Sequence, residues 1–513
     1  MPATSEALQP ATVSNWRRLI RRLFTPSLGD CFFLTVVVLL FSTSSDGWRQ
    51  LLVDGDAGWH IRTGDWILQH HTVPYTDPFS FSKPGGSWYA WEWLADVIFA
   101  AAHARQGLRG VVVISGLTIA ASILVLFRYL LWRGAGITLA VLLSVLTADA
   151  SRLHYLARPH VFTLLLLPVC LWILDRDRER PWGGVWLLVP IAALWTNLHA
   201  GFVALFVSLG LYTAGAFVKG RWAAVRRPFL VSAACLLATL ANPYGYLLHV
   251  HILQHLGSDW IARFVDEFQP PNIRFEGMYK YEAMLFAGIG LTILLVRRRK
   301  YEDALLMGFW AHESLQAARH VPLYMFAAAP IVGTELARIA EPYTGKWQRS
   351  SLLGTARDLA ADFSPAARRN SIWLAVAAAI IWYLPAPGWP KDFPDIFPVA
   401  MVERQRALLA PAAGPPSRVL SSDQWGGYLI YKLYPSIHVF ADGRFDYYGD
   451  DLGNEHLCLM SGCERWRELM EKWNFNIALL PRNWPLIDLL KSLPQWRVID
   501  QDKTAILLRK STD

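Results

Sequence analysis

Two aspartates flank a single glycine early in the chain, in the sequence Asp54-Gly55-Asp56. Carboxylates at this spacing can take a proton from a substrate hydroxyl or bind a divalent metal ion. The same residues also favour a plain Asx turn, in which the aspartate bonds only nearby backbone. Trp59 and His60 then open a short amphipathic helix that is expected to reach His70. The sequence therefore predicts either a reactive carboxylate pair or a turn at the start of this helix.

Cationic and imidazole side chains recur in short polar stretches further along the chain. Guanidinium groups hold phosphate oxygens through paired hydrogen bonds, and imidazoles orient substrates or bind metals. The alternatives are arginines that anchor helix ends at a membrane interface and a histidine that only completes the packing. The candidate binding residues are His60, Arg158, His199, Glu267, Arg319 and His320.

Several common catalytic motifs are absent from the sequence. There is no GxxxxGK[ST] phosphate loop, no GxGxxG fingerprint and no GxSxG elbow. His312-Glu313 is followed by Gln316, where a zinc protease needs a second histidine. Acid/base or divalent-metal chemistry remains as the expected class of reaction.

The composition indicates a membrane protein. Of 513 residues, 53% are hydrophobic and only 18% are charged. The net charge of +8 does not indicate nucleic-acid binding, because the basic residues form short clusters between apolar runs. Apolar runs long enough to cross about 30 Å of hydrocarbon recur until residue 384. They predict eleven transmembrane helices, at about 31–41, 110–131, 136–149, 160–174, 183–197, 201–218, 228–244, 282–297, 303–318, 320–338 and 372–386.

The distribution of lysine and arginine predicts the orientation of these helices. Arg17, Arg18, Arg21 and Arg22 precede the first apolar run, which places the N-terminus in the cytoplasm. Residues 88–103 are apolar but carry Glu92 and Asp96. If they lie along the outer membrane surface instead of spanning it, most basic clusters face the cytoplasm, as the positive-inside rule requires. The C-terminal domain then lies outside the cytoplasm.

Four regions are expected along the chain. Residues 1–29 form a cytoplasmic segment, 30–388 a transmembrane domain with a long outer loop at 46–109, 389–414 a Pro-rich linker, and 415–513 a soluble α/β domain. Asp442-Gly443-Arg444 in this last domain is interpreted as a hairpin turn in preference to an acceptor-binding group. Cys458 and Cys463 are five residues apart, which allows a local disulfide in an oxidising compartment.

Several of these motifs resemble one family. The stretches 53–67 and 73–80 are similar to the first outer loop of bacterial membrane proteins in the GT-C glycosyltransferase superfamily. Glu92-Trp93-Leu94, Arg158-Pro159-His160, 195–201 and Asn242-Pro243-Tyr244-Gly245 resemble the same group, as do 426–429 and 440–444 near the C-terminus. The resemblance implies a helical membrane body that transfers a sugar from a polyprenyl-phosphate carrier at the outer face of the bacterial inner membrane.

The resemblance also implies roles for individual residues. An acidic residue of the first loop lies at the reaction centre in this superfamily, and the matching positions are Asp54 and Asp56. Asp56 is expected to act as base or metal ligand with Asp54 as its partner. Arg158, Arg319 and His320 are expected to hold the lipid phosphate. His60, His199 and Glu267 are weaker candidates for orienting groups.

The function expected from the sequence is a polyprenyl-phosphate-dependent glycosyltransferase. Its partners are a polyprenyl-phosphate-linked sugar and membrane lipids, with no nucleic acid. A divalent metal ion, Mg²⁺ or Mn²⁺, bound by Asp54 and Asp56 is the one cofactor considered. The alternatives are a transporter or flippase of a lipid-linked substrate, and a non-catalytic membrane scaffold.

Overall fold

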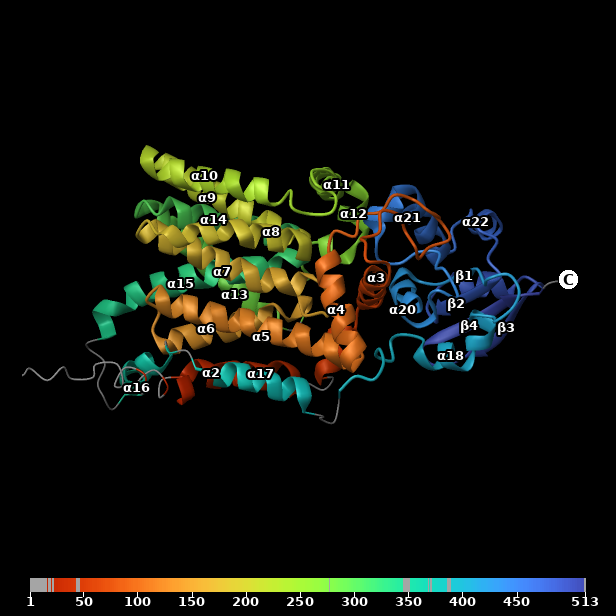
Figure 1. The fold of residues 1–513 in the computed structure, drawn as a ribbon, viewed down its shortest axis with the longest axis horizontal. Coiled ribbons are helices and arrows are strands. Elements are labelled where there is room, and N and C mark those ends of the chain that lie inside the picture. The colour runs from red at the N-terminus through yellow and green to blue at the C-terminus, as the bar shows by residue number, and fades with distance from the viewer. Residues whose placement is uncertain are drawn as a thin grey trace, which may run out of the picture.

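The fold is described from a computed structural model, and the description covers residues 16, 20, 23–42, 47–275, 277–344, 351–367, 369, 371–384 and 389–511. A bundle of long helices forms one end of an elongated molecule (Figure 1). Residues 389–511, the tail domain, form the other end. Arg17, Arg18, Arg21 and Arg22, on which the predicted orientation of the N-terminus depends, lie outside the described residues.

A helix lies at each of the eleven positions where the sequence predicts a membrane span. Their apolar side chains pack against one another in a single continuous core. The helices are α2 (Leu28–Val37), α5 (Leu108–Trp132), α6 (Ile137–Ala150), α7 (His160–Glu179), α8 (Leu188–Leu198), α9 (Val203–Val218), α10 (Trp222–Ala238), α13 (Tyr279–Arg297), α14 (Tyr301–Gln316), α15 (Val321–Thr344) and α17 (Trp373–Tyr383), and α16 (Leu352–Ala367) precedes α17.

Four helical stretches in the described part of the chain are long and apolar enough to cross a membrane by themselves. They are Leu108–Trp132, Ala200–Val218, Tyr279–Arg297 and Ala318–Thr344. A span needs about 20 apolar residues because the hydrocarbon core is about 30 Å thick. The structure therefore supports a multi-pass membrane protein, and the number of eleven crossings stays a prediction.

Two helices of the first long loop, α3 (Asp56–His70) and α4 (Trp93–Gln106), lie between the bundle and the tail domain. Helix α4 includes most of the segment 88–103, and it runs across the ends of the bundle helices instead of alongside them (Figure 1). Shorter helices at the same end are η2 (Gly47–Leu52), η3 (Arg152–His154), α11 (Leu247–Leu256), α12 (Asp259–Phe264), η6 (Asp266–Phe268) and η7 (Ala318–His320).

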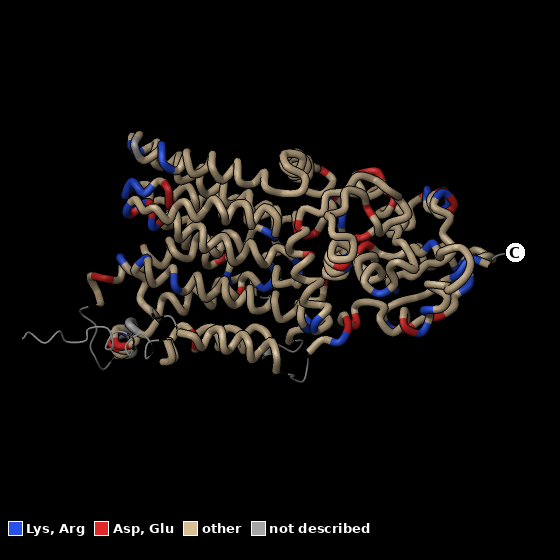
Figure 2. The backbone as a smooth tube through the Cα atoms, viewed as in Figure 1, with Lys and Arg blue, Asp and Glu red and all other residues tan. Residues whose placement is uncertain are grey.

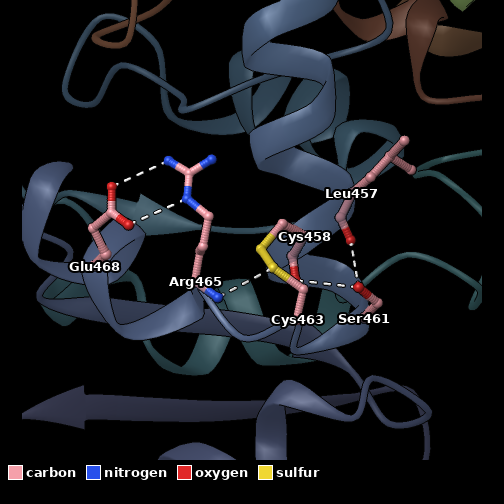
Figure 3. The surroundings of a disulfide bond; sticks show 6 residues. All are labelled: Leu457, Cys458, Ser461, Cys463, Arg465 and Glu468. Carbon is pink, nitrogen blue, oxygen red and sulfur yellow. Dashed lines mark hydrogen bonds and ion pairs between the residues drawn. A yellow bond between two sulfur atoms is a disulfide. The ribbon is translucent and has the colours of Figure 1, made fainter.

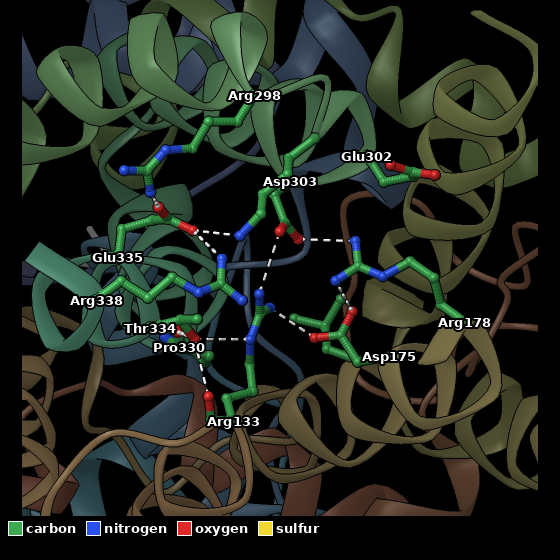
Figure 4. Close-up of polar contacts among 12 residues, drawn as sticks. Arg133, Asp175, Arg178, Arg298, Glu302, Asp303, Pro330, Thr334, Glu335 and Arg338 are labelled. Carbon is green, nitrogen blue, oxygen red and sulfur yellow. Dashed lines mark hydrogen bonds and ion pairs between the residues drawn. The ribbon is translucent and has the colours of Figure 1, made fainter. Parts of the chain in front are cut away.

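Buried ion pairs join the bundle helices near the cytoplasmic ends that the sequence predicts (Figure 4). Arg133, directly after α5, binds Asp175 of α7 at 2.6 Å and Asp303 of α14 at 3.2 Å. Arg178 binds the same two carboxylates, each at 2.9 Å. Buried charges are costly without partners, so this network favours one arrangement of the three helices.

The charges on the bundle are distributed unevenly. Lysine and arginine gather at the end opposite the tail domain, and the middle of the bundle is largely uncharged (Figure 2). An excess of basic residues marks the cytoplasmic side of membrane proteins. The orientation of the chain across the membrane stays a prediction.

The tail domain contains one mixed sheet covered by helices, as the sequence predicts. Strand β1 (Val419–Leu420) is parallel to β2 (Ile477–Pro481), and β4 (Ala505–Lys510) is antiparallel to both β2 and β3 (Trp496–Gln501). The strand order is β1-β2-β4-β3. The covering helices are α20 (Asp423–Leu433), α21 (Phe445–Ser461), α22 (Trp466–Lys472) and α23 (Leu486–Lys491).

Two expectations for the C-terminal part differ from the structure. Residues 389–414, expected to form a linker, contain α18 (Val399–Arg404) and α19 (Arg406–Leu409), and Phe393 stacks edge-on against Tyr428 of the tail domain. Their buried aromatic and aliphatic side chains make them part of the tail domain core. Asp442-Gly443-Arg444 does not form a hairpin, because it leads into helix α21 instead of joining two strands.

Cys458 and Cys463 form a disulfide, with their Cα atoms 5.0 Å apart (Figure 3). The bond joins the end of α21 to the turn before α22. The local disulfide expected from the spacing of the two cysteines is therefore confirmed. Disulfides persist in oxidising compartments, which agrees with a tail domain outside the cytoplasm.

Helices α3 and α20 meet through their backbones. A Cβ atom added to Gly58 would lie 2.3 Å from the carbonyl oxygen of Gly427, and one added to Gly427 would lie 2.4 Å from that of Gly55. Only glycine permits this approach, since real Cβ atoms do not come so close to a neighbouring backbone. The start of α3 is thus fixed directly by the tail domain.

Gly427→Ala is expected to lower the midpoint of thermal unfolding, because the added methyl would push α20 away from Gly55. Overpacking of this kind costs about 1–3 kcal/mol. Gly210→Ala in α9 is the matched control, since nothing lies within 4 Å of its Cβ position. Equal midpoints for the two variants, measured on purified protein, would contradict the backbone contact.

Candidate active site

The predicted acidic residues stand at the start of α3. The side chain of Asp54 accepts a hydrogen bond from the backbone N–H of Asp56 at 2.8 Å, so the Asx turn is present. The second oxygen of the Asp54 carboxylate and the carboxylate of Asp56 nevertheless bind Arg158. The Asx turn is therefore present, and its two aspartates also share one guanidinium group. The reactivity of this pair stays a prediction.

One guanidinium group gathers three carboxylates. Arg158, in the loop between η3 and α7, lies 2.9 Å from Asp54, 3.1 Å from Asp56 and 3.5 Å from Glu267 of η6. Arg319 of η7 binds Glu267 from the other side at 3.2 Å. Successive ion pairs thus connect the charged groups from Asp54 to Arg319, and these groups come from four loops.

These charged side chains line a cavity of about 620 Å³. Its far wall belongs to the tail domain, with Gln424 of α20, Gly443, and Phe445 and His456 of α21. A Cβ at Gly443 would lie 2.1 Å from Oδ1 of Asp56, so any larger residue there would displace that carboxylate. The cavity is therefore built jointly by the bundle and the tail domain.

The surroundings shift the pKa values of Asp56 and Glu267 in opposite directions. Burial, together with the nearby charge of Asp54, raises the pKa of Asp56 to about 8, and Arg158 opposes this shift. Burial alone would also raise the pKa of Glu267, but Arg319 and Arg158 outweigh it and hold that pKa well below its usual value. Asp56 can thus exchange a proton near neutral pH, whereas Glu267 stays ionised.

A second chain of polar groups lies behind this cavity. His60 binds Asp96 of α4 at 2.6 Å and lies 3.7 Å from Glu92. His199 lies 3.4 Å from Glu92 on its other side. Burial lowers the pKa of both histidines and raises the pKa of Glu92 to about 8. His60 and His199 are not among the residues that line the cavity, so they support it from behind.

His320 also lies apart from the cavity. Its ring is 3.5 Å from the carboxylate of Glu313. The predicted set thus divides in two. Asp54, Asp56, Arg158, Glu267 and Arg319 share one cavity, and His60, His199 and His320 do not line it.

The tail domain also holds the first loop through a buried arginine. Arg444 is 2% exposed and binds Asp442 at 2.7 Å and Asp77 of the first loop at 2.8 Å. The ring of Trp88 lies 4.5 Å from the guanidinium carbon. Asp77 still caps its own turn, accepting from the backbone N–H of Ser80 at 2.9 Å. The sequence did not indicate this link, although Asp442-Gly443-Arg444 was itself singled out as a motif.

The donor set does not fit the predicted metal ion. Within the described residues, no group of three or more His, Cys, Asp or Glu side chains is arranged to hold a metal. Asp54 and Asp56 instead share the guanidinium of Arg158. A Mg²⁺ or Mn²⁺ ion at these two carboxylates would require Arg158 to release both.

A second cavity of about 880 Å³ adjoins the first and shares Leu153, Asp266 and Ala318 with it. Much of its wall is apolar, with Leu40 and Phe41 from the end of the first predicted span. Arg152 and Lys280 line it together with Asp149 and Asp266, and Asp149 pairs with both cations. An amphipathic molecule can therefore lie across both cavities, with its apolar part against this wall.

Comparison with solved structures identifies the architecture. The archaeal oligosaccharyltransferase AglB from Archaeoglobus fulgidus, in complex with an inhibitory peptide and a dolichol-phosphate, aligns over 92% of this chain and 70% of its own, with a TM-score of 0.55 at 13% identity. ArnT from Cupriavidus metallidurans, bound to undecaprenyl phosphate, aligns over 97% of this chain and 98% of its own, with a TM-score of 0.52 at 11% identity. The chain has a GT-C fold.

The GT-C fold expected from the sequence motifs is thus confirmed. A second structure of the Archaeoglobus fulgidus oligosaccharyltransferase, tethered to an acceptor peptide, gives a TM-score of 0.56 at 12% identity over 92% of this chain and 69% of its own. No protein-family model and no curated protein sequence matches the chain. Identities this low show a common fold only.

Arg158→Gln is expected to destabilise the GT-C body, because it leaves Asp54, Asp56 and Glu267 without their shared cation. Removing one partner from a buried ion pair costs about 3–5 kcal/mol. Arg152→Gln is the matched control, since Arg152 is 45% exposed and, among the described residues, its ion pair is with Asp149 at 3.7 Å. Thermal unfolding should show a large drop for Arg158→Gln alone, and similar curves would refute the central role of Arg158.

Proposed function

We propose that this protein is a membrane glycosyltransferase that moves a sugar from a polyprenyl-phosphate carrier to an acceptor hydroxyl. The observation that supports the proposal is the cavity in which Asp54 and Asp56 face Arg158 and Arg319. It supplies a carboxyl group of suitable pKa beside two cations that suit a phosphate.

The two structural neighbours support the class of donor. AglB was solved with a dolichol-phosphate and ArnT with undecaprenyl phosphate, which are both polyprenyl phosphates. The apolar cavity beside Leu40 and Phe41 provides a place for such a chain here. The identity of the sugar and that of the acceptor do not follow from these similarities.

The proposed reaction uses Asp56 as the base. As the acceptor oxygen attacks the anomeric carbon of the sugar, its proton passes to the Asp56 carboxylate. The bond between the anomeric carbon and the phosphate oxygen breaks, and the electron pair leaves with the lipid phosphate. Arg158 and Arg319 stabilise the charge that develops on this leaving group. Asp54 keeps Arg158 in place.

We also propose that the reaction takes place on the outer face of a bacterial inner membrane. The basic end of the bundle opposite the tail domain supports a cytoplasmic N-terminus (Figure 2). The disulfide of the tail domain supports its position outside the cytoplasm.

Asp56→Asn is expected to reduce sugar transfer by about 10²–10⁴-fold, the usual contribution of a placed base. Transfer is measured with purified protein supplied with polyprenyl-phosphate sugars and candidate acceptors. Asp65→Asn is the matched control on the same helix, because Asp65 pairs with Arg62 at 2.9 Å away from the cavity. Undiminished transfer in Asp56→Asn would remove Asp56 from the mechanism, and wild-type protein inactive on every donor would favour a non-catalytic scaffold.

The pH dependence of transfer tests the same assignment. A base works in its ionised form, and the pKa of Asp56 is raised to about 8. Below that value kcat/KM is expected to rise about tenfold per pH unit, and above it to level off. A rate that stays flat between pH 5 and about 9 would contradict Asp56 as the base.

A further inference from the structure

A third cleft lies where the bundle meets the tail domain. Its volume is about 720 Å³, and it lies between η2, the stretch 394–396 and two loops of the tail domain, 481–483 and 503–504. None of its described lining residues lines the catalytic cavity. It is a separate concave site on the outer side of the bundle.

Positive charge exceeds negative charge in this cleft. Arg49, Arg482 and Lys503 line it, and the carboxylate there is that of Asp395. Asp395 lies 3.7 Å from Arg49 and 3.3 Å from Lys503, so it is shared between two cations. Arg482 contacts only neutral acceptors in the described structure, the side chain of Gln501 at 3.5 Å and the carbonyl of Asp502 at 3.3 Å. An anion with several oxygens would satisfy all three cations.

The position of the cleft at one edge of the tail-domain sheet is a second indication of a binding site, independent of its positive charge. Pro481 ends β2 and Arg482 follows it, and Trp425 belongs to α20, the helix that follows the parallel strand β1. In α/β sheets, ligands bind in the crevice beyond the carboxyl ends of the parallel strands. The cations therefore lie at the edge of the sheet where binding sites form.

We propose that this cleft binds a phosphate group, held by Arg482 together with Arg49 and Lys503. Guanidinium forks match phosphate oxygens in pairs, and lysine adds a point charge. The phosphate belongs either to an anionic phospholipid of the outer leaflet or to a free phosphate. Gln50 lines both this cleft and the apolar cavity of about 880 Å³, so a lipid whose headgroup lies here has an apolar surface beside it.

Such a phosphate would connect two parts of the chain that are distant in sequence. Arg49 belongs to η2, which leads directly to Asp54, whereas Arg482 and Lys503 belong to the tail domain. The bound anion would replace the weak link through Asp395, whose side chain is 71% exposed. The tail domain and the segment before the catalytic carboxylates would then be held together more firmly.

The test is thermal unfolding of the full-length protein in a non-ionic detergent at constant ionic strength. One series adds inorganic phosphate, and a second adds phosphatidylglycerol or, as the neutral comparison, phosphatidylcholine. Wild-type protein is expected to show a saturable rise in unfolding midpoint. Stabilisation by inorganic phosphate identifies a free anion as sufficient, and stabilisation by phosphatidylglycerol alone identifies a lipid headgroup.

Arg482→Gln is expected to weaken the apparent affinity about tenfold or more, since it removes a bidentate charged contact. Arg497→Gln is the matched control, because Arg497 is exposed on β3 and does not line the cleft. Both side chains are exposed, so neither change should prevent folding. The proposal is overturned if neither ligand raises the midpoint, or if Arg482→Gln responds like Arg497→Gln, which would place the anion outside this cleft.

Discussion

The guanidinium group of Arg158 is the interaction on which the cavity depends. It holds Asp54, Asp56 and Glu267 within 3.5 Å, and those residues come from loops that are otherwise separate. Three carboxylates in so small a space would repel one another without it. The same cation tempers the rise in the pKa of Asp56, so that this carboxyl group ionises near neutral pH instead of staying protonated. Assembly of the site and its acid/base behaviour thus have one physical origin.

The tail domain completes this arrangement from the other side. It meets α3 at the Gly58–Gly427 contact, and Arg444 binds Asp77 while Gly443 packs against Asp56. The carboxylates therefore have a fixed position relative to both the bundle and the tail domain. Groups that stabilise a charge developing in a transition state are most effective when they are already fixed in position before the reaction. The tail domain is accordingly part of the site and more than a cover for it.

The sequence was sufficient for features set by local composition. The lengths of the apolar runs located the helices, and the spacing of Cys458 and Cys463 indicated a local disulfide. The Asp54-Gly55-Asp56 motif and the resemblance to the GT-C superfamily also selected Asp56 and Arg158. Features set by contacts across the chain were missed. Nothing near Arg444 indicates that Asp77 is its partner, and the burial of Phe393 depends on Tyr428. His320 has a suitable side chain, but the turn of η7 directs it toward Glu313.

The hydrogen bond between Gly55 and Gln424 joins residues 369 positions apart. A ribosome adding about 5–20 residues per second needs tens of seconds to make the intervening chain. During that interval the helices of the bundle can insert into the bilayer one after another. Helix α3 lies at the membrane surface without its contact to α20 until the tail domain is made. The wall that faces Asp56 is among the last parts to be synthesised. The cavity is therefore completed only after the bundle has inserted into the membrane. A chain that ends after α17 would insert into the bilayer but would lack the wall that the tail domain supplies.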